Sequence, residues 1–307
     1  MDKANPQSER AAWGGGRVTP QELEAARQTV RFCSGLSRTE LARTICEHWG
    51  WVTASGSHKV TACLKVLEGL EAGGLLRLPG KRPMSRWHTD QAGGPALTQS
   101  TQPGAPLVGE LWAVGSVGLE VIERREPGRL WQEYVQRYHY LGYRQPFGCF
   151  VRYFISSSAG VLGCVLMAGA AKAIGARDRW IGWGRQRRQQ NLPWVINNTR
   201  LLIFPWVRIR HLGSHVLGQL ARRVRQDWQA RWGYEPLLME TFVDPARFSG
   251  TCYRAAGWLA LGRTTGRGLA RAGRIYRSTP KLIYVKGLAP DFRQRLCQGP
   301  LRGRGEP

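Results

Sequence analysis

The chain has none of the short motifs by which many enzymes are recognised from sequence alone. No Gly-x-Ser-x-Gly, Walker loop or His-Glu-x-x-His occurs in its 307 residues. The seven cysteines show no Cys-x-x-Cys spacing and are odd in number, so they indicate neither a zinc knuckle nor a disulfide framework. We expect most of them to be reduced and buried.

Long apolar runs are missing as well. The most apolar stretch, residues 160–171, ends before Lys172 and is too short to span a bilayer, which takes about 20 apolar residues. The beginning of the sequence shows no signal-peptide pattern. A cytoplasmic protein without membrane contact is therefore expected.

Acidic residues are scarce, and the resulting charge is unevenly spread. The chain has 45 Lys and Arg against 21 Asp and Glu, a formal net charge of +24. Residues 1–80 hold 10 basic and 8 acidic residues, a net +2, so the other 227 residues carry +22. Such a field attracts polyanions. DNA or RNA is the expected partner, bound mostly by the second part of the chain.

Length and composition predict two domains. Residues 1–18 are polar and glycine-rich and are expected to form a disordered lead. Residues 80–106 are rich in Pro, Gly, Gln, Ser and Thr, which is typical of a linker. The first domain then covers residues 19–79 and the second covers residues 107–307.

The first domain has the outline of a winged helix-turn-helix. Its sequence predicts three helices and a short strand, at residues 21–32, 37–49, 57–71 and 75–79. Ser37 and Glu40 are spaced as a capping box at the start of the second helix. The third helix would read DNA, with His58, Lys59 and Lys65 as candidates for phosphate and base contacts. Winged helices also serve as protein contacts, and that alternative stays open.

The second domain alternates strands and helices. The expected elements are strands at 117–123, 149–156, 161–168 and 281–285, a helix at 130–140, and a strand, turn, helix, strand and short helix within 197–258. Apolar residues recur at helical spacing in the long helix and should pack on the sheet. They are Leu212, Val216, Leu217, Leu220, Val224 and Trp228.

The stretch before that run, residues 177–188, reads RDRWIGWGRQRR. Arginines interleaved with tryptophans suit a surface that pairs phosphates with guanidinium groups and stacks bases on rings. A solvated arginine-rich loop beside a buried tryptophan is the alternative. The nucleic-acid candidates of this domain are Arg177, Arg179, Trp183, Arg185, Arg187, Arg188, Asn197, Asn198, Arg200, Arg263 and Arg267.

The turn before the long helix is a candidate anion site, because the first N–H groups of a helix have no partner within it. Its residues are Arg208, Arg210, Gly213, Ser214 and His215. The pattern resembles the pyrophosphate loop of the GNAT acyltransferase fold, Arg/Gln-x-x-Gly-x-Gly/Ala, which implies an acyl-CoA cofactor. Arg210 and Gly213 match that loop, but His215 stands where the family has Gly or Ala. This departure weighs against acetyl-CoA or another acyl-CoA, and the cofactor stays unknown.

Two residues are candidates for acid–base chemistry. Tyr253 lies four residues before a Gly-Trp pair, as does the tyrosine that protonates the leaving thiolate in the GNAT family. Glu240, at the end of a strand, is a candidate for the base that deprotonates an amine. A tyrosine packed on the sheet and a glutamate paired with an arginine are the alternatives.

A further grouping consists of His139, Glu240, Asp244 and Cys252, whose side chains could hold a divalent ion for phosphodiester chemistry. Along an extended strand, however, Glu240 and Asp244 would lie about 13 Å apart. Chelation would need a sharp bend before Pro245. A metal site is therefore not expected, although His139, Asp244 and Cys252 stay candidates for a catalytic role.

Longer motifs resemble one family closely. They are RYHYLGYRQPFG (137–148), RDRWIGW, NNTRLLIFPWVR, METFVDPARFSGTCYRAAGW and LGRTTGRG (261–268). They are similar to the DruA family of the Druantia anti-phage system, and the likeness extends from about residue 30. Relatives of that family also occur beside or fused to transposase genes. The resemblance implies a host-defence or mobile-element protein that acts on or near nucleic acid, together with other defence proteins.

The expected fold is α/β (α+β), a GNAT-like mixed sheet with flanking helices, preceded by a small winged-helix domain. Three functions stay open. They are a nucleic-acid-binding component of a defence system, an acyltransferase that modifies nucleic acid or protein, and a transposase- or nuclease-associated strand processor. Whether the chain is an enzyme stays open with them.

Overall fold

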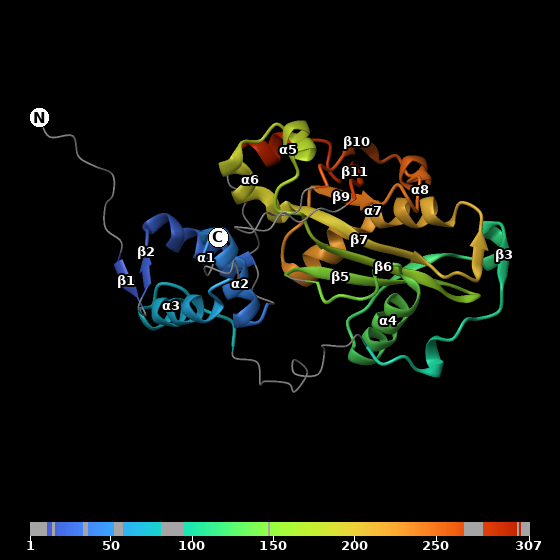
Figure 1. Cartoon of the computed structure of the whole chain (residues 1–307), viewed down its shortest axis with the longest axis horizontal. Helices are drawn as coiled ribbons and strands as arrows, with labels where there is room; N and C mark the ends of the chain where they lie inside the picture. Colours follow the sequence, from blue (N-terminus) through green and yellow to red (C-terminus); the bar gives the residue numbers. More distant parts are fainter. Residues whose placement is uncertain are drawn as a thin grey trace, which may run out of the picture. The chain divides into compact units, whose positions relative to one another are not determined.

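The computed structural model describes residues 11–13, 16–32, 36–51, 58–80, 95–146, 148–266, 279–299 and 301. These residues fall into two compact units (Figure 1). The first unit holds the described residues up to 80, and the second holds those from 95 onwards. No described helix is long and apolar enough to cross a membrane.

The first unit is built on three helices, as the sequence predicts. They are α1 (Pro20–Phe32), α2 (Arg38–Trp49) and α3 (Val60–Ala72). The capping box of α2 is present, since the Glu40 N–H bonds to the Ser37 hydroxyl and the Glu40 carboxylate accepts the Ser37 N–H. Leu41 and Ile45 of α2 and Leu67 of α3 are fully buried and form the core of the unit.

The β-structure of this unit differs from the expectation. Residues 75–79 form no strand, because side chains take their backbone groups: Arg27 Nε donates to the Leu75 carbonyl at 2.6 Å, and the Leu78 N–H donates to Glu71 Oε1 at 2.9 Å. Instead, β1 (Ala11–Trp13) pairs antiparallel with β2 (Gly16–Val18), within the segment expected to be disordered. A winged helix is therefore not shown. Residue Ser57, predicted in the third helix, lies outside the described residues.

The second unit is built on a mixed sheet. In the described residues its order is β10-β11-β9-β7-β6-β5-β4, and β7–β9 is its parallel pair. The strands are β4 (Gly118–Val121), β5 (Phe150–Ser157), β6 (Gly160–Gly169), β7 (Val195–Ile203), β9 (Leu238–Val243), β10 (Leu259–Arg263) and β11 (Leu282–Gly287). A separate parallel pair joins β3 (Leu107–Gly109) to β8 (Val207–Ile209). Strands β3, β8 and β10 were not predicted; the predicted strands of this domain are all present.

Helices cover both faces of this sheet. They are α4 (Arg125–Tyr138), α5 (Gly175–Ile181), α6 (Arg185–Asn191), α7 (Leu212–Trp232), α8 (Thr251–Ala255) and α9 (Phe292–Cys297). Tyr153 of β5 bonds to Asp227 of α7, and its neighbour Phe154 contacts the Tyr134 ring of α4. Because successive strand residues face opposite ways, α4 and α7 lie on opposite faces. All six predicted core residues of α7 are buried.

Two stretches expected to be irregular are ordered. The described end of the predicted linker contains a 3₁₀ turn (Gln99–Thr101), and the Thr101 hydroxyl donates to Glu133 of α4 at 2.6 Å. Glu133 is buried and needs such donors, which is why this polar segment packs on α4. The arginine-rich stretch, a loop in one of the alternatives, forms α5 and α6.

Candidate functional site

The candidate site lies where two parallel strands part. Strands β7 and β9 pair only from Val195–Leu238 to Asn197–Glu240, although β7 continues to Ile203 and β9 to Val243. The register of β7 against β6 also shifts next to this point, between Leu166 and Met167. Beyond Asn197 the facing edges of β7 and β9 therefore have no ladder between them. Ligand sites form in such openings at the carboxyl ends of strands.

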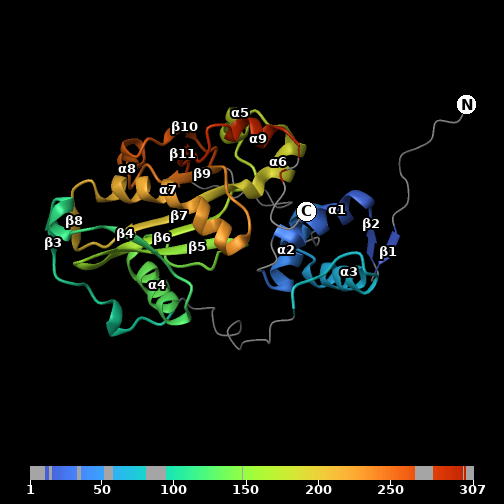
Figure 2. The same ribbon diagram turned by 180° about the vertical axis from the view of Figure 1, so that it is seen from behind.

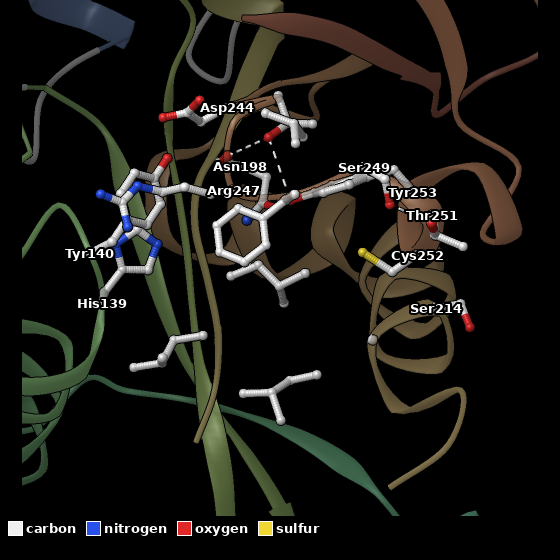
Figure 3. Close-up of a pocket in the computed structure, with 18 of the residues that line it drawn as sticks. His139, Tyr140, Asn198, Ser214, Asp244, Arg247, Ser249, Thr251, Cys252 and Tyr253 are labelled. Carbon is white, nitrogen blue, oxygen red and sulfur yellow. Dashed lines mark hydrogen bonds between the residues drawn. The ribbon is translucent and has the colours of Figure 1, made fainter. Parts of the chain in front are cut away.

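The opening between the two strands forms part of a pocket of about 760 Å³. Its lining comes from the carboxyl halves of β7 and β9, the end of α4, the start of α7, and α8 with the loop before it. Figure 3 shows His139 and Asp244 on one side of the strand that carries Asn198, and Cys252 and Ser214 on the other. The volume is in the range of about 300–1,000 Å³ that small-molecule sites occupy.

The start of α7 forms one end of the pocket. The first bond within the helix runs from the His215 N–H to the His211 carbonyl at 3.0 Å, so the N–H groups of Gly213 and Ser214 precede the helical ladder. The first turn contains no acidic residue, and α7 has 21 residues. His211 has φ 61°, the one positive φ of a non-glycine residue in the described chain. This end suits an anion.

The five predicted cofactor-binding residues divide at this point. Gly213 and Ser214 line the pocket. Arg208 and Arg210 do not line the pocket. Arg208 is exposed on β8, and Arg210 forms an ion pair with Glu110 at 3.1 Å. The ring of His215 lies 2.8 Å from the Gln219 amide, and it does not line the pocket either.

Tyr253 of α8 lines the pocket. Its hydroxyl donates to Asn198 Oδ1 at 2.6 Å, and the Thr241 hydroxyl donates to the Asn198 carbonyl at 2.9 Å. The three residues join α8 to the parted strands. Burial raises the pKa of Tyr253 well above its usual value, so the hydroxyl stays protonated and acts as a donor.

The other side of the pocket carries rings and charges. His139 directly follows α4 as its C-cap, and the His139 and Tyr140 rings stack with their centroids 4.8 Å apart. Burial, with a smaller effect of Arg200, lowers the pKa of His139 to about 4, so the imidazole is neutral at pH 7. Asp244 follows the last residue of β9, and Arg247 lies over the Tyr140 ring at 5.1 Å.

Glu240 lies outside the pocket, in the protein interior. It is fully buried, and it accepts from Arg177 Nη1 at 2.8 Å and from the Ala171 N–H at 2.7 Å. Burial raises the pKa of Glu240, and the Arg177 guanidinium opposes that shift. Both carboxylate oxygens are occupied, so this placement does not fit the expected base; it corresponds to the alternative of a glutamate paired with an arginine.

The predicted nucleic-acid residues also separate by exposure. Arg179, Arg185 and Arg263 are exposed, whereas Arg187, Arg188 and Arg200 are half-buried. Arg177, Trp183, Asn197 and Asn198 are buried and cannot meet a nucleic acid without rearrangement. In the first unit His58, Lys59 and Lys65 are exposed. Arg267 lies outside the described residues.

The grouping of His139, Glu240, Asp244 and Cys252 is only partly brought together. His139, Asp244 and Cys252 line the pocket, and Glu240 does not. Among the described residues no group of three or more His, Cys, Asp or Glu is placed to hold a metal ion. Most described cysteines are free and buried, as expected.

The predicted site residues omit many that line the pocket, among them Tyr140, His211, Arg247 and Phe248. Histidine is among the non-glycine residues enriched at positive φ, but the conformation is uncommon even for histidine, so the residue type alone did not predict it at His211. Arg247 and Phe248 follow Asp244 closely in METFVDPARFSG, so a loop after a strand that ends in a polar residue was the available signal.

These features define a class of protein: a mixed α/β unit with flanking helices and a pocket between parting parallel strands. The family model described as Druantia protein DruA matches residues 98–295, and the chain belongs to this family. The match does not include residues 30–97, where the resemblance was expected to begin. No curated protein matches the chain.

Acetyltransferases are among the solved structures similar to the chain. Aminoglycoside acetyltransferase AAC(6')-Ib, with coenzyme A and kanamycin, is 16% identical with a TM-score of 0.38 over 59% of this chain and 98% of that one. A Bacillus subtilis acetyltransferase with CoA is 8% identical, with a TM-score of 0.33 over 57% of this chain and 100% of that one. A putative acetyltransferase of the GNAT family from Desulfovibrio desulfuricans is 14% identical, with a TM-score of 0.32 over 57% of this chain and 100% of that one. At these scores we infer neither substrate nor cofactor from the likeness.

Proposed function

We propose that the chain is a nucleic-acid-binding component of an anti-phage defence system, which acts with other proteins of that system. The observation that carries this proposal is an excess of positive charge on α5, α6, α9, β10, β11 and the segments next to them. The described residues 170–191, 259–266 and 279–299 contain eleven Lys and Arg against two Asp. The helices α5, α6 and α9 gather at the same end of the second unit (Figure 2).

The two aspartates of this region neutralise little of the positive charge at its surface. Asp178 is buried and bonded to Arg177, Arg188 and the Trp183 indole. Asp291 lies 3.9 Å from Arg295. The exposed cations include Arg179, Arg185 and Arg263. Arg293 lies over the Trp180 ring at 4.0 Å, which places a flat guanidinium and ring at the same surface. Phosphates and bases are the ligands that such a surface favours.

A charge-reversal variant tests the proposal. Arg179→Glu, Arg185→Glu and Arg263→Glu together should weaken binding to labelled DNA and RNA, and the slope of log affinity against log salt should shrink by about 1 for each phosphate that is no longer neutralised. The matched control makes the same charge change elsewhere, at Arg124, Arg129 and Arg222. Equal losses in both triple variants would refute this surface, and no binding at low salt would refute the function. Cleavage of the nucleic acid with Mg²⁺ present would instead support a strand processor.

A second candidate, acyl transfer, is favoured by the continuity of the pocket from the start of α7 to Tyr253. The N–H groups at Gly213 and Ser214 would hold phosphates of an acyl-CoA, while Tyr253 would donate its proton. A bound acyl thioester would supply the activated acyl group. The fit is incomplete, because Arg208 and Arg210 do not line the pocket.

Substitutions at Ser214 test this candidate and should leave the fold stable. Ser214→Asp adds a negative charge that suits a helix start but repels phosphate, whereas Ser214→Asn keeps the site neutral. Calorimetry should show that coenzyme A binds to the wild type and to Ser214→Asn and does not bind to Ser214→Asp. Equal behaviour of all three proteins would exclude phosphate binding at this helix.

A further inference from the structure

The side of the pocket away from α7 is built by two loops that hold each other. One follows α4 and carries His139, Tyr140 and Leu141; the other follows β9 and carries Asp244 and residues 247–248. The Tyr140 and Phe248 rings lie 5.7 Å apart, and the Arg247 guanidinium lies over Tyr140. Figure 3 shows Tyr140, Arg247 and Asp244 close together on this side. The side chains are thus placed by tertiary contacts as one group.

This group brings aromatic and apolar side chains to the pocket. The His139 and Tyr140 rings are 29° from parallel. Leu141 and Phe248 line the same side and are 46% and 54% exposed. Exposed apolar side chains gathered at a pocket indicate a ligand with an apolar face. Rings combined with an arginine in a strongly cationic protein favour stacking on a nucleobase.

The polar groups fit the edge of a base. Asp244 is half-buried, and it is the one carboxylate among the described lining residues. One oxygen accepts the Ala246 N–H at 3.1 Å, which fixes the carboxylate. The Leu141 N–H donates to His139 Nδ1 at 3.2 Å, so the neutral ring is assigned its proton on Nε2. A carboxylate acceptor beside a stacking surface selects a base with an exocyclic amino group.

Cations flank this side of the pocket. Arg247 is exposed, and Arg200 is half-buried and donates to the Gly142 carbonyl at 3.2 Å. The register places Arg263 beside Leu282 and Leu282 beside Val243, the residue before Asp244. Arg263 therefore lies two strands away, about 10 Å across the sheet. A base held at Tyr140 would have its phosphates near these side chains.

We propose that this side of the pocket binds a single unpaired nucleobase that carries an exocyclic amino group, with the Tyr140 and Phe248 rings as the stacking surface and Asp244 as the hydrogen-bond acceptor. For a base within a strand, the proposal rests on the nucleic-acid function proposed above. The base of a free nucleotide has the same chemistry, and the experiment separates the two sources.

Two binding measurements test the proposal on the full chain. The first titrates cytidine, adenosine, guanosine and uridine monophosphates by calorimetry. The second follows the fluorescence of an oligonucleotide with one 2-aminopurine, single-stranded or paired in a duplex. Tyr140→Ala, Asp244→Asn and Arg247→Ala are compared with the wild type. Trp112→Ala is the control, because Trp112 is 83% exposed and does not line the pocket.

We expect 2-aminopurine fluorescence to change on binding when the base is unpaired and not when it is paired. Tyr140→Ala should weaken binding about tenfold or more, the size expected when one stacking interaction is removed. Uridine monophosphate should bind more weakly than the other three, and Asp244→Asn should reduce that difference. Arg247→Ala changes an exposed side chain, so it keeps the test valid if Tyr140→Ala does not fold.

The outcomes separate this proposal from the proposed function. If monophosphates bind and oligonucleotides do not, the base pocket stands and the nucleic-acid function fails. If oligonucleotides bind but the 2-aminopurine signal is the same in the wild type and in all three pocket variants, the base pocket is overturned and the function stands. If neither ligand binds, both fail.

Discussion

Two carboxylates at the end of one strand have opposite surroundings. Glu240 is fully buried within β9 and bonded to Arg177, and Asp244 lies just past the end of β9 and faces the pocket. They are four residues apart in the sequence, and both were candidates for the same chemistry. The comparison teaches that the role of a carboxylate on this strand depends on whether the neighbouring strand still pairs beside it.

The physical reason lies in the register. At Glu240 the ladder to β7 is intact and α5 covers the face, so a charge there needs a buried partner. At Asp244 the two strands have parted, and the side chain meets solvent and the rings of the pocket. The following predictions test this contrast, from the largest expected effect to the smallest.

Removal of the buried cation should have the largest effect. Arg177→Ala leaves the Glu240 and Asp178 carboxylates in the interior without their shared partner. We expect the free energy of unfolding to fall by about 3–5 kcal/mol. Urea unfolding at pH 7 measures it. The exposed neighbour Arg179→Ala is the control, with an expected change within about 0.5 kcal/mol; similar losses in both would contradict the contrast.

Removal of the Tyr253 hydroxyl should have an intermediate effect. Tyr253→Phe leaves the buried Asn198 Oδ1 without its donor, which should cost about 1–3 kcal/mol in unfolding free energy. Tyr143→Phe is the matched control, because the Tyr143 hydroxyl bonds to the exposed Gln145. A stability loss in Tyr253→Phe with any acyl-transfer activity intact would show that the hydroxyl is structural only.

The neutral ring of His139 predicts a dependence on pH. Its pKa is about 4 in the folded chain, against about 6.5 for an ordinary histidine. As pH falls from about 6.5 towards 4, the unfolded chain takes up a proton that the folded chain does not, so stability is lost. We expect a loss on the order of 1–2 kcal/mol, because the ring is partly exposed. Urea unfolding between pH 4.5 and 7.5 should show a smaller loss in His139→Asn; parallel curves would contradict the assignment.

The half-buried member of the carboxylate pair, Asp244, should matter least for stability. Asp244→Asn keeps an oxygen that can accept the Ala246 N–H, so the turn is preserved. We expect the free energy of unfolding, measured by thermal unfolding, to change by less than about 0.5 kcal/mol. A loss as large as that of Arg177→Ala would show that both carboxylates are structural and that the contrast is wrong.

Much of the second unit could be predicted, because its signals are local. The six apolar residues of α7 follow the helical period, and the β5–β6 hairpin is marked by its turn. In the first unit the helices were predicted and the strand at residues 75–79 was not realised. The difference arises because side chains outside that segment take its backbone groups: Arg27, 48 residues before Leu75, and Glu71, seven residues before Leu78.

The site was predictable in part. Gly213, Ser214, Tyr253, Asp244 and His139 line the pocket as candidate positions near strand and helix ends. Arg177 was predicted as a nucleic-acid contact and Glu240 as a catalytic group, and both side chains are buried. A sequence gives the charge of a side chain and not its depth. His211 was missed since its backbone conformation is imposed by the turn into α7.

The sequence by itself determined the charge, the family and the periodic elements of the second unit, because composition, motif and spacing are properties of the chain. The tertiary structure alone decided which charges are buried, where β7 and β9 part, and which loops meet around Tyr140. These features depend on contacts between residues far apart in sequence, such as Ala171 with Glu240 and Tyr140 with Arg247, and local pattern does not encode such contacts.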